Sequence, residues 1–424
     1  MRKTVDSLGP FPLPIIGNMH QLAYKMFIKK KTFVEAIREW VEEYGSVHTF
    51  WFGPIASVNI CDYATAVDAM VKKGNTFADR ISPYLFNLTR NNRGIIASNG
   101  PAWLEQRRFA LHTLRNFGLG RNIIEERIMF EFNIACEDLE KRLKTGETSI
   151  DPFNMFELLV GNIINRILFT DRFEKVVNLE DEKTFFALKA KAHETTENFT
   201  IFDMLIDEFN VNLPLVSQRT KHLLNPLEAV LDFIRGQIQQ REEMLLMSLL
   251  DLWMAGQETT AVTLNWAFSY LLLNPQLKGR LEQELLSVTK GERLLSITDR
   301  PNTPFYNATL TFNPERYFNG DRLEQMVVAF GLGKRSCLGE SLAQAELYLV
   351  IRFCLIVFHV RYGENFACSR SSEISYFATS CHLIRSICRE RKPEGKGGRF
   401  VGATHTILFF NGDKRKSLLS KSFE

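Results

Sequence analysis

The residues best suited to chemistry lie in the segment FGLGKRSCLG (330–339), where one cysteine follows two adjacent cations among three glycines. An amphipathic helix is predicted from residue 340, so Cys337 lies just before a helix N-terminus, where free amides and the helix dipole stabilise a thiolate. Such a thiolate suggests a nucleophile or a metal ligand. No histidine lies nearby in sequence to act as a base for a nucleophile. Zinc needs more than one protein ligand, so a single thiolate suits haem iron better than zinc. The structural alternative is a small buried cysteine at a tight turn.

A second group of reactive side chains is AGQETT (255–260), inside the apolar segment 245–273. Gly256 removes a side chain where a ligand can approach closely. The Thr259 hydroxyl is expected to bond back to a carbonyl one turn earlier and to loosen the helix. Glu258 is then an acid in an apolar wall, and a buried ionisable group beside a cleft is a candidate for function.

The same segment has two further interpretations. The simplest is a fully buried core helix. The other is a membrane span, because the segment is long enough to cross a bilayer. Asp251, Gln257 and Glu258 lie in its first half, where polar and charged groups are costly in a bilayer. A chain that stays soluble without detergent would exclude the membrane span.

The elements that must position these residues are mostly helical, so the predicted fold class is mainly α with a small β portion. Apolar residues recur at helical spacing between short turn clusters. Helices are expected at 32–44, 101–116, 121–143, 152–170, 183–197, 226–243, 245–273, 275–287 and 340–358. Two β-rich runs, 47–53 and 56–62, meet at Gly53-Pro54 and predict a hairpin.

Composition limits the class of protein. The 424 residues are 45% apolar, enough for a large core, and the net charge of +3 implies no nucleic-acid partner. Seven scattered cysteines without a Cys-x-x-Cys pair argue against a disulfide framework or a structural zinc site, and favour a reducing compartment. Residues 1–363 are predicted to form one domain. The basic, glycine-rich residues 364–424 are predicted to be an irregular or disordered tail.

Several motifs together resemble the cytochrome P450 family of haem-thiolate monooxygenases. FGLGKRSCLG meets every fixed position of that family's haem-ligand pattern, Phe-x-x-Gly-x-Arg-x-Cys-x-Gly, with Phe330, Gly333, Arg335, Cys337 and Gly339. AGQETT is similar to the oxygen-activation element, WLEQR (103–107) to an early helix that reaches the haem, and NPERY (313–317) to the Pro-Glu-Arg segment. The opening GPFPLPIIGN resembles the proline-rich hinge of microsomal members, above all the drug-metabolising branch of animals. The resemblance covers residues 9–363.

The resemblance implies a cytochrome P450-like helical fold around haem b, with Cys337 as the axial ligand of the iron. Trp103, Arg107 and Arg335 would hold the haem propionates through charge-assisted and indole hydrogen bonds. The other residues implied to bind the cofactor are Ala255, Gly256, Phe330, Gly333 and Gly339. Glu258 and Thr259 would relay protons to the oxygen that is being activated.

The implied function is insertion of one oxygen atom from O2 into a small lipophilic substrate of the xenobiotic, steroid or fatty acid class. Electrons would come from NADPH through a partner reductase, with cytochrome b5 as a further partner. The implied location is the cytoplasmic face of the endoplasmic reticulum membrane, through peripheral contact. The first residues contain no run of anchor or signal-peptide length, which predicts a chain without an anchor and leaves the cytoplasm as the alternative.

The pocket is expected to be lined by loops and by one wall of the central helix, because binding sites favour both. The segments concerned are 81–100, 199–215 and 254–258. Four apolar residues of the first segment suggest a lipophilic ligand: Phe86, Leu88, Ile95 and Ile96.

The chain also departs from the family pattern. Members carry a Glu-x-x-Arg helix before the Pro-Glu-Arg segment, and no such pair occurs between Pro275 and Arg316. Arg316 would therefore lose its buried partners and must turn to solvent or find another acid. A second omission is expected in 237–253, and the tail lacks the family's closing strands. These gaps support a competing hypothesis, a non-catalytic or decayed member that binds haem weakly or not at all.

Overall fold

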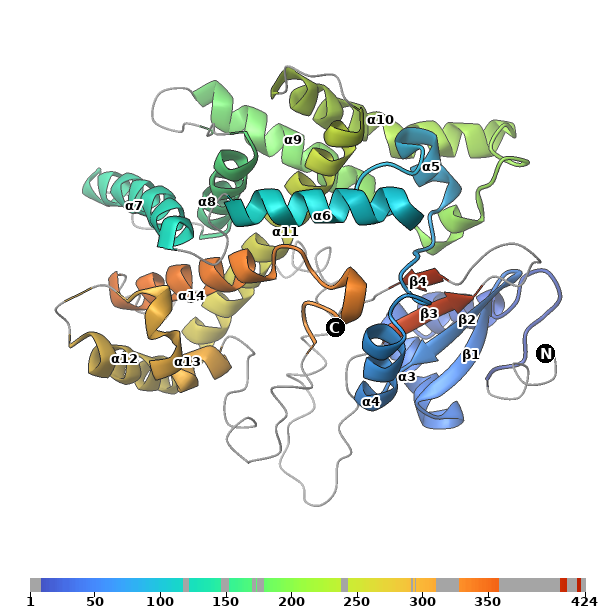
Figure 1. Cartoon of the computed structure of the whole chain (residues 1–424), viewed down its shortest axis with the longest axis horizontal. Coiled ribbons are helices and arrows are strands. Elements are labelled where there is room, and N and C mark those ends of the chain that lie inside the picture. Colours follow the sequence, from blue (N-terminus) through green and yellow to red (C-terminus); the bar gives the residue numbers. More distant parts are fainter. Residues whose placement is uncertain are drawn as a thin grey trace. The chain divides into compact units, whose positions relative to one another are not determined.

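The fold is mainly α-helical with one small sheet, as the sequence predicts (Figure 1). The computed structural model describes residues 9–116, 122–145, 152–169, 173, 179–237, 243–290, 293, 295–309, 328–357, 405–409 and 418–420. The chain divides into two compact units. The first consists of Met1–Ile81, Arg322–Cys337 and Tyr362–Glu424, and the second of Ser82–Asp321 and Leu338–Arg361.

An antiparallel sheet with the strand order β1-β2-β3-β4 is the centre of the first unit (Figure 1). Its strands are β1 (Val47–Phe52), β2 (Ile55–Ile60), β3 (His405–Phe409) and β4 (Leu418–Ser420). β1 and β2 form the predicted hairpin, and Gly53 at the turn has a φ of 56°, in the region that favours glycine. Phe50 of β1 is fully buried and contacts the Trp40 ring, with 5.5 Å between ring centroids.

The predicted irregular tail, 364–424, lies mostly outside the described residues. Its two described stretches are β3 and β4, and β3 pairs with β2 so that Ile60 lies opposite His405. For these stretches the expected lack of strands is wrong. The run HTILF is rich in β-branched and aromatic residues, which favour strands, but it is short and lies in basic and glycine-rich surroundings. The division into a domain of 1–363 and a separate tail stays a prediction.

Short helices surround the sheet of the first unit. They are α2 (Met19–Ala23), η1 (Tyr24–Ile28), α3 (Phe33–Tyr44), α4 (Tyr63–Val67), η2 (Asp68–Lys72) and η7 (Gly333–Arg335). α3 begins where the sequence predicts because Thr32 and Glu35 form a capping box: the Glu35 amide donates to Thr32 Oγ1 (3.2 Å), and the Thr32 amide donates to Glu35 Oε2 (2.8 Å). Glu35 thus has a local role at a helix start.

In the described part of the second unit, all regular secondary structure is helical. Its helices are α5 (Tyr84–Arg90), α6 (Gly100–Asn116), α7 (Asn122–Lys144), α8 (Pro152–Leu168), α9 (Leu179–Asn198), η3 (Ile201–Leu205), α10 (Pro214–Gln237), α11 (Glu243–Leu273), α12 (Pro275–Thr289), η4 (Ile297–Asn302), α13 (Pro304–Thr309) and α14 (Glu340–Val357). Most of the long helices begin and end within a few residues of their predicted bounds.

α10 is the exception among the long helices. The sequence predicts a helix over 226–243, in which Pro226 would stand in the first turn, where proline is favoured. The helix instead begins at Pro214, ends at Gln237 and contains Pro226. Pro226 is buried with Leu223 and Val230 on the same helix, and this burial offsets the lost backbone hydrogen bond.

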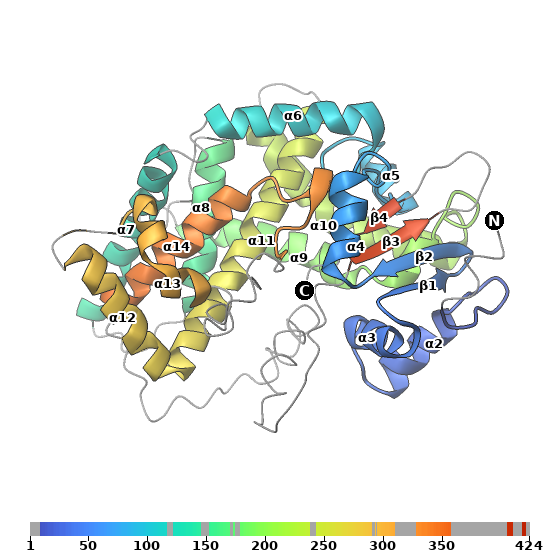
Figure 2. The same ribbon diagram turned by 60° about the horizontal axis from the view of Figure 1, so that its bottom comes forward.

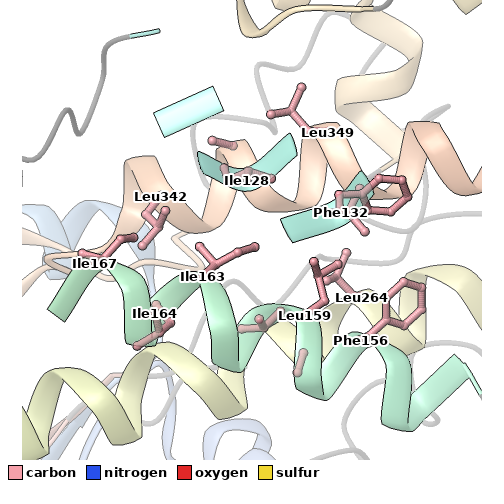
Figure 3. Packing of buried hydrophobic residues seen from close by; sticks show 14 of the residues in the cluster. Ile128, Phe132, Phe156, Leu159, Ile163, Ile164, Ile167, Leu264, Leu342 and Leu349 are labelled. Carbon is pink, nitrogen blue, oxygen red and sulfur yellow. The ribbon is translucent and has the colours of Figure 1, made fainter. Parts of the chain in front are cut away.

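The core of the second unit forms around α11, with α8 and α14 packed along it (Figure 2). Figure 3 shows side chains of α7, α8, α11 and α14 interdigitating, with Ile128, Ile163, Leu264 and Leu349 among them. Each fully buried side chain of this kind contributes roughly 1.5–3 kcal/mol to stability. Within the described ranges, no helix has the length and apolarity needed to cross a bilayer.

Candidate functional site

The loop around Cys337 is fixed by its own backbone. Gly331 and Gly333 have φ values of 74° and 72°, which other residues rarely adopt. The Cys337 amide donates to the carbonyl of Phe330 at 2.8 Å and so closes the loop. A Cβ on Gly333 would lie only 1.9 Å from the carbonyl oxygen of Met70, so no other residue fits there. Geometry therefore requires glycine at positions 331 and 333.

Arg335 anchors the same loop to the rest of the first unit. Its side chain is only 5% exposed, and Nε donates to the carbonyl of Ala78 at 2.6 Å. On the other side of the loop, Leu332 packs against the cluster that contains Ile60 and Met70. The loop is therefore held at both ends, which limits the positions that Cys337 can take.

Cys337 itself is exposed, whereas Cys61 of the same unit is buried. The alternative of a small buried cysteine at a tight turn is therefore wrong. Gly339, unlike Gly331 and Gly333, is absent from the described glycines with positive φ. Gly339 instead accepts from the Ala343 amide at 2.9 Å, at the start of α14, and among described atoms nothing lies within 4 Å of a Cβ built on it.

The polar turn of α11, residues 255–260, has the predicted local geometry. Thr259 Oγ1 donates to the carbonyl of Ala255 at 2.8 Å, which is the expected bond to the preceding turn. Ala255 and Thr259 are exposed, whereas their neighbours Gln257 and Thr260 are buried. Ala255 and Thr259 thus form an exposed stripe at mid-length of α11, where the neighbouring residues are buried or half-buried.

Gly256 has a different structural role from the one expected. A Cβ built on it would lie 2.6 Å from Cδ1 of Ile164, a residue of α8. The space left by the missing side chain is therefore filled by a core residue, and Gly256 permits close packing of α8 on α11. The sequence could not show this, because the neighbour comes from a helix far away in the chain.

Glu258 is not an acid in an apolar wall. Its side chain is 37% exposed, and Oε2 lies 3.4 Å from Nζ of Lys189 on α9. Lys189 also forms an ion pair with Glu157, a buried residue of α8. Burial raises the pKa of Glu157, and the charge of Lys189 opposes that rise. Sequence reasoning missed both partners, although a lone glutamate in the apolar run MFELLVG was a detectable signal.

Another acid missed at the sequence level faces this turn from α14. Glu346 is 1% exposed, and neither of its carboxyl oxygens has a hydrogen-bond partner in the described structure. Burial raises its pKa to about 8, opposed by the nearby Thr260 hydroxyl, which does not reach hydrogen-bond geometry. Glu346 is therefore a neutral acid at neutral pH, buried against α11.

Trp103 and Arg107 lie on one face of α6, as their spacing predicts. The Arg107 guanidinium lies 5.9 Å from the centroid of the Trp103 ring, in a cation–π arrangement. Trp103 is buried together with Ala110 and Leu114 on that face. The contact limits the orientation of the arginine side chain.

The structure brings some of the predicted site residues together and leaves others in separate units. Phe330, Gly333, Arg335 and Cys337 share one loop of the first unit. The second unit contains the remaining predicted residues, Trp103, Arg107, Ala255, Gly256, Glu258, Thr259 and Gly339.

Two of the expected pocket segments meet in the second unit. The Phe86 and Phe199 rings have centroids 5.9 Å apart, and Leu85 forms a cluster with Ile206 and Leu223. The segments 81–100 and 199–215 are thus neighbours.

The structure describes only part of the segment in which the Glu-x-x-Arg pair is expected to be missing. α13 ends at Thr309, and no such pair occurs in the described parts of 275–309. Arg316 and the NPERY segment lie outside the described residues.

Comparisons with known proteins agree with these motifs. The family model "Cytochrome P450" matches residues 8–248, 241–311 and 305–368. Its pieces meet at 241–248 and 305–311, near the two places where omissions are predicted. The chain is 31% identical to "Probable cytochrome P450 cyp-35D1" of Caenorhabditis elegans, over 83% of the chain and 88% of that protein. It is 27% identical to cytochrome P450 2H2 of Gallus gallus (83% and 87%) and 26% identical to cytochrome P450 2J2 of Homo sapiens (84% and 86%).

Proposed function

The chain belongs to the cytochrome P450 family of haem monooxygenases, and from this premise we propose that it inserts one oxygen atom from O2 into a small lipophilic substrate. The xenobiotic, steroid and fatty acid classes all fit that description. The observation that carries the proposal is the exposed thiol of Cys337 in a closed glycine loop.

The residues described here fit a haem with cysteine ligation. The donor is a single accessible thiol, and the backbone around it cannot accept bulkier residues at Gly333. When bound, haem supplies the oxygen-activating chemistry, and a thiolate ligand favours cleavage of the oxygen–oxygen bond.

Three side chains are proposed to hold the haem carboxylates: Trp103, Arg107 and Arg335. Each can donate hydrogen bonds to an anion, and the two guanidinium groups add charge. The contact of Arg335 with Ala78 and that of Arg107 with Trp103 orient these side chains in advance. The proposal also assigns Ala255, Gly256, Phe330, Gly333 and Gly339 to the lining of the cofactor site.

Thr259 and Glu258 are proposed to handle protons. The Thr259 hydroxyl donates to Ala255, so its oxygen lone pairs stay available on the exposed stripe. Glu258 is accessible enough to exchange protons with water, and Lys189 holds its carboxylate in place. Together these groups supply a hydroxyl next to the substrate space and an acid in contact with solvent.

The redox partners and the location follow from the resemblance alone. We include NADPH as the electron source, a partner reductase, cytochrome b5, and peripheral contact with the cytoplasmic face of the endoplasmic reticulum membrane. The sequence feature that supports the location is the proline-rich segment GPFPLPIIGN.

The test is the absorbance difference of the purified, reduced chain with and without carbon monoxide. The proposal predicts a thiolate-haem band that disappears in Cys337→Ala and persists in the control Cys136→Ala, which alters a half-buried cysteine of α7. A chain that binds no haem would contradict the proposal and support the decayed alternative. Incubation with 18O2 and a lipophilic substrate should then place one labelled atom in the product.

A further inference from the structure

Two of the four described strands of the first unit's sheet lie outside the part of the chain that matches the cytochrome P450 family. The matches to the family model end at residue 368, whereas β3 and β4 lie at 405–409 and 418–420. β3 and β4, red in Figure 1, follow β2 in the sheet. A segment from beyond the family match is therefore the direct neighbour of the β1–β2 hairpin.

β3 pairs with β2 in one antiparallel register. The register runs from Ala56 opposite Phe409 to Ile60 opposite His405 without a break. The β3 sequence, HTILF, is rich in the residue types that favour strands. β4 pairs with the other side of β3, and the sequence between these two strands contains an Asn-Gly dipeptide, which favours turns. β3 and β4 thus form a hairpin that continues the sheet.

The edge of β2 that β3 occupies has little protection in its own sequence. Ile55–Ile60 (IASVNI) contains no charge and no proline, the features that keep an open strand edge from pairing with other chains. Without β3, the main-chain N–H and C=O groups on this side of β2 would lack their partners. β2 therefore needs a neighbouring strand here.

The opposite edge of the sheet, along β1, is covered by the N-terminal segment. The Asn18 amide donates to the Trp51 carbonyl at 2.8 Å, and the Trp51 amide donates to Asn18 Oδ1 at 2.7 Å. A Cβ built on Gly9 would lie only 1.8 Å from the Thr49 carbonyl oxygen, so this segment lies directly against the strand. Both sides of the β1–β2 hairpin are thus covered by other segments of the same chain.

β2 also supports the cysteine loop. Ile60, the residue opposite His405, belongs to a buried cluster with Met70, and Leu332 of the loop packs against that cluster. The Met70 carbonyl also limits the space at Gly333. Release of β3 would free the end of β2 that contains Ile60 and would weaken this support.

We propose that the outer edge of β2 is a strand-binding site, that its ligand is residues 405–409 of the same chain, and that the β3–β4 hairpin is a clamp that keeps the cysteine loop in place. A strand tethered to its own chain meets its site at an effective concentration on the order of 0.1–1 mM, so at micromolar protein it outcompetes the strand of a second copy. The role at the cysteine loop rests on the proposed function, whereas the strand pairing does not.

The first test is a disulfide across the two strands of the full chain. Val58→Cys with Ile407→Cys places two thiols at partner positions, within the span of a disulfide. The control, Val58→Cys with Leu408→Cys, shifts the second thiol by one residue, to the other face of the sheet.

At micromolar concentration, oxidation should link 58 to 407 within one molecule at least tenfold more than 58 to 408. Mass spectrometry of the digested monomer measures both yields. Equal yields would overturn the strand pairing. A link between two molecules would show that a second copy donates the strand, and would overturn the proposal that the ligand belongs to the same chain.

A second measurement, hydrogen–deuterium exchange in the full chain, does not depend on cysteine chemistry. Ile407→Pro should break the pairing, because proline cannot donate to a strand ladder. Amides of β2 should then exchange about tenfold faster or more, whereas core amides of α8 keep their protection. The control Ser372→Pro alters the tail outside both strands and should leave β2 unchanged. Unchanged exchange in Ile407→Pro, or equal acceleration in Ser372→Pro, would overturn the proposal.

The role at the cysteine loop is tested by haem loss, measured as transfer of haem to an excess of apomyoglobin. Ile407→Pro should lose haem about tenfold faster than the wild type, and Ile407→Val, which suits a strand, should stay within about twofold of it. Equal rates in all three proteins would refute the role at the loop. A wild-type chain without a thiolate-haem band would instead refute the proposed function, so the two failures are distinguishable.

Discussion

The cysteine loop of the first unit and the polar turn of α11 in the second unit contain the residues proposed to carry the chemistry, and the two are held in different ways. The loop is fixed by backbone geometry: two glycines with positive φ, the carbonyl of Met70 and the bond from Cys337 to Phe330. The turn is fixed by side chains from other helices, above all Ile164 and Lys189. Substitutions should therefore be costly in the loop and milder in the turn.

The largest effect is expected for Gly333→Ala in the loop. The new methyl group would meet a backbone carbonyl, which cannot move aside as a side chain can. The first unit should lose about 3 kcal/mol or more of unfolding free energy, and haem content should fall with it. Urea unfolding and haem absorbance measure both quantities.

Gly45→Ala is the matched control in the same unit. Gly45 also has a positive φ, 93°, but no described atom lies within 4 Å of a Cβ there. It should cost only the torsional strain, about 1 kcal/mol. Equal costs for the two variants would mean that the Met70 contact does not fix the loop.

A second effect concerns Glu346, buried against the polar turn. Its pKa in the folded chain, about 8, lies above the ordinary value of 4.5, so the folded state holds the proton more tightly than the unfolded state. The stabilisation from this proton is complete below pH 4.5 and is lost as the pH rises toward 8.

Glu346→Gln should remove that dependence, because the amide does not titrate. Relative to the variant, the wild type should lose on the order of 1 kcal/mol of unfolding free energy for each pH unit in this range. Urea unfolding at pH 5, 6.5 and 8 measures the difference. Parallel curves for the two proteins would show that Glu346 is not a buried neutral acid.

A third prediction is Gly256→Ala in the turn itself. The methyl group would press on the flexible end of Ile164, so the expected cost is about 1–3 kcal/mol, smaller than at Gly333. The double variant Gly256→Ala, Ile164→Val should recover part of this loss. No recovery would place the strain elsewhere than in the contact between α8 and α11.

The smallest effect on stability is expected for Thr259→Val. The residue is exposed, and its hydroxyl bonds only within its own helix in the described structure, so unfolding free energy should change by less than about 0.5 kcal/mol. Product formation should nevertheless fall relative to NADPH consumption, because the proposed proton relay loses its hydroxyl. Unchanged coupling between the two rates would remove Thr259 from the relay.

The contrast between loop and turn also explains what the sequence could predict. The loop could be predicted from the sequence because its constraints are local: Gly331, Gly333 and Cys337 lie within seven consecutive positions, 331–337. The hydroxyl bond of Thr259 was predictable for the same reason. Ile164 beside Gly256 and Lys189 beside Glu258 were not, since each comes from another helix. The bounds of α10 failed because burial outweighed the local rule for Pro226.

The most direct test of the central claim is to change the axial ligand. If Cys337 is the axial ligand, Cys337→His, reduced and treated with carbon monoxide, should keep haem but replace the thiolate-haem band with the spectrum of an imidazole-ligated haem. A thiolate band that persists in Cys337→His would show that another cysteine ligates the iron, and would contradict the account.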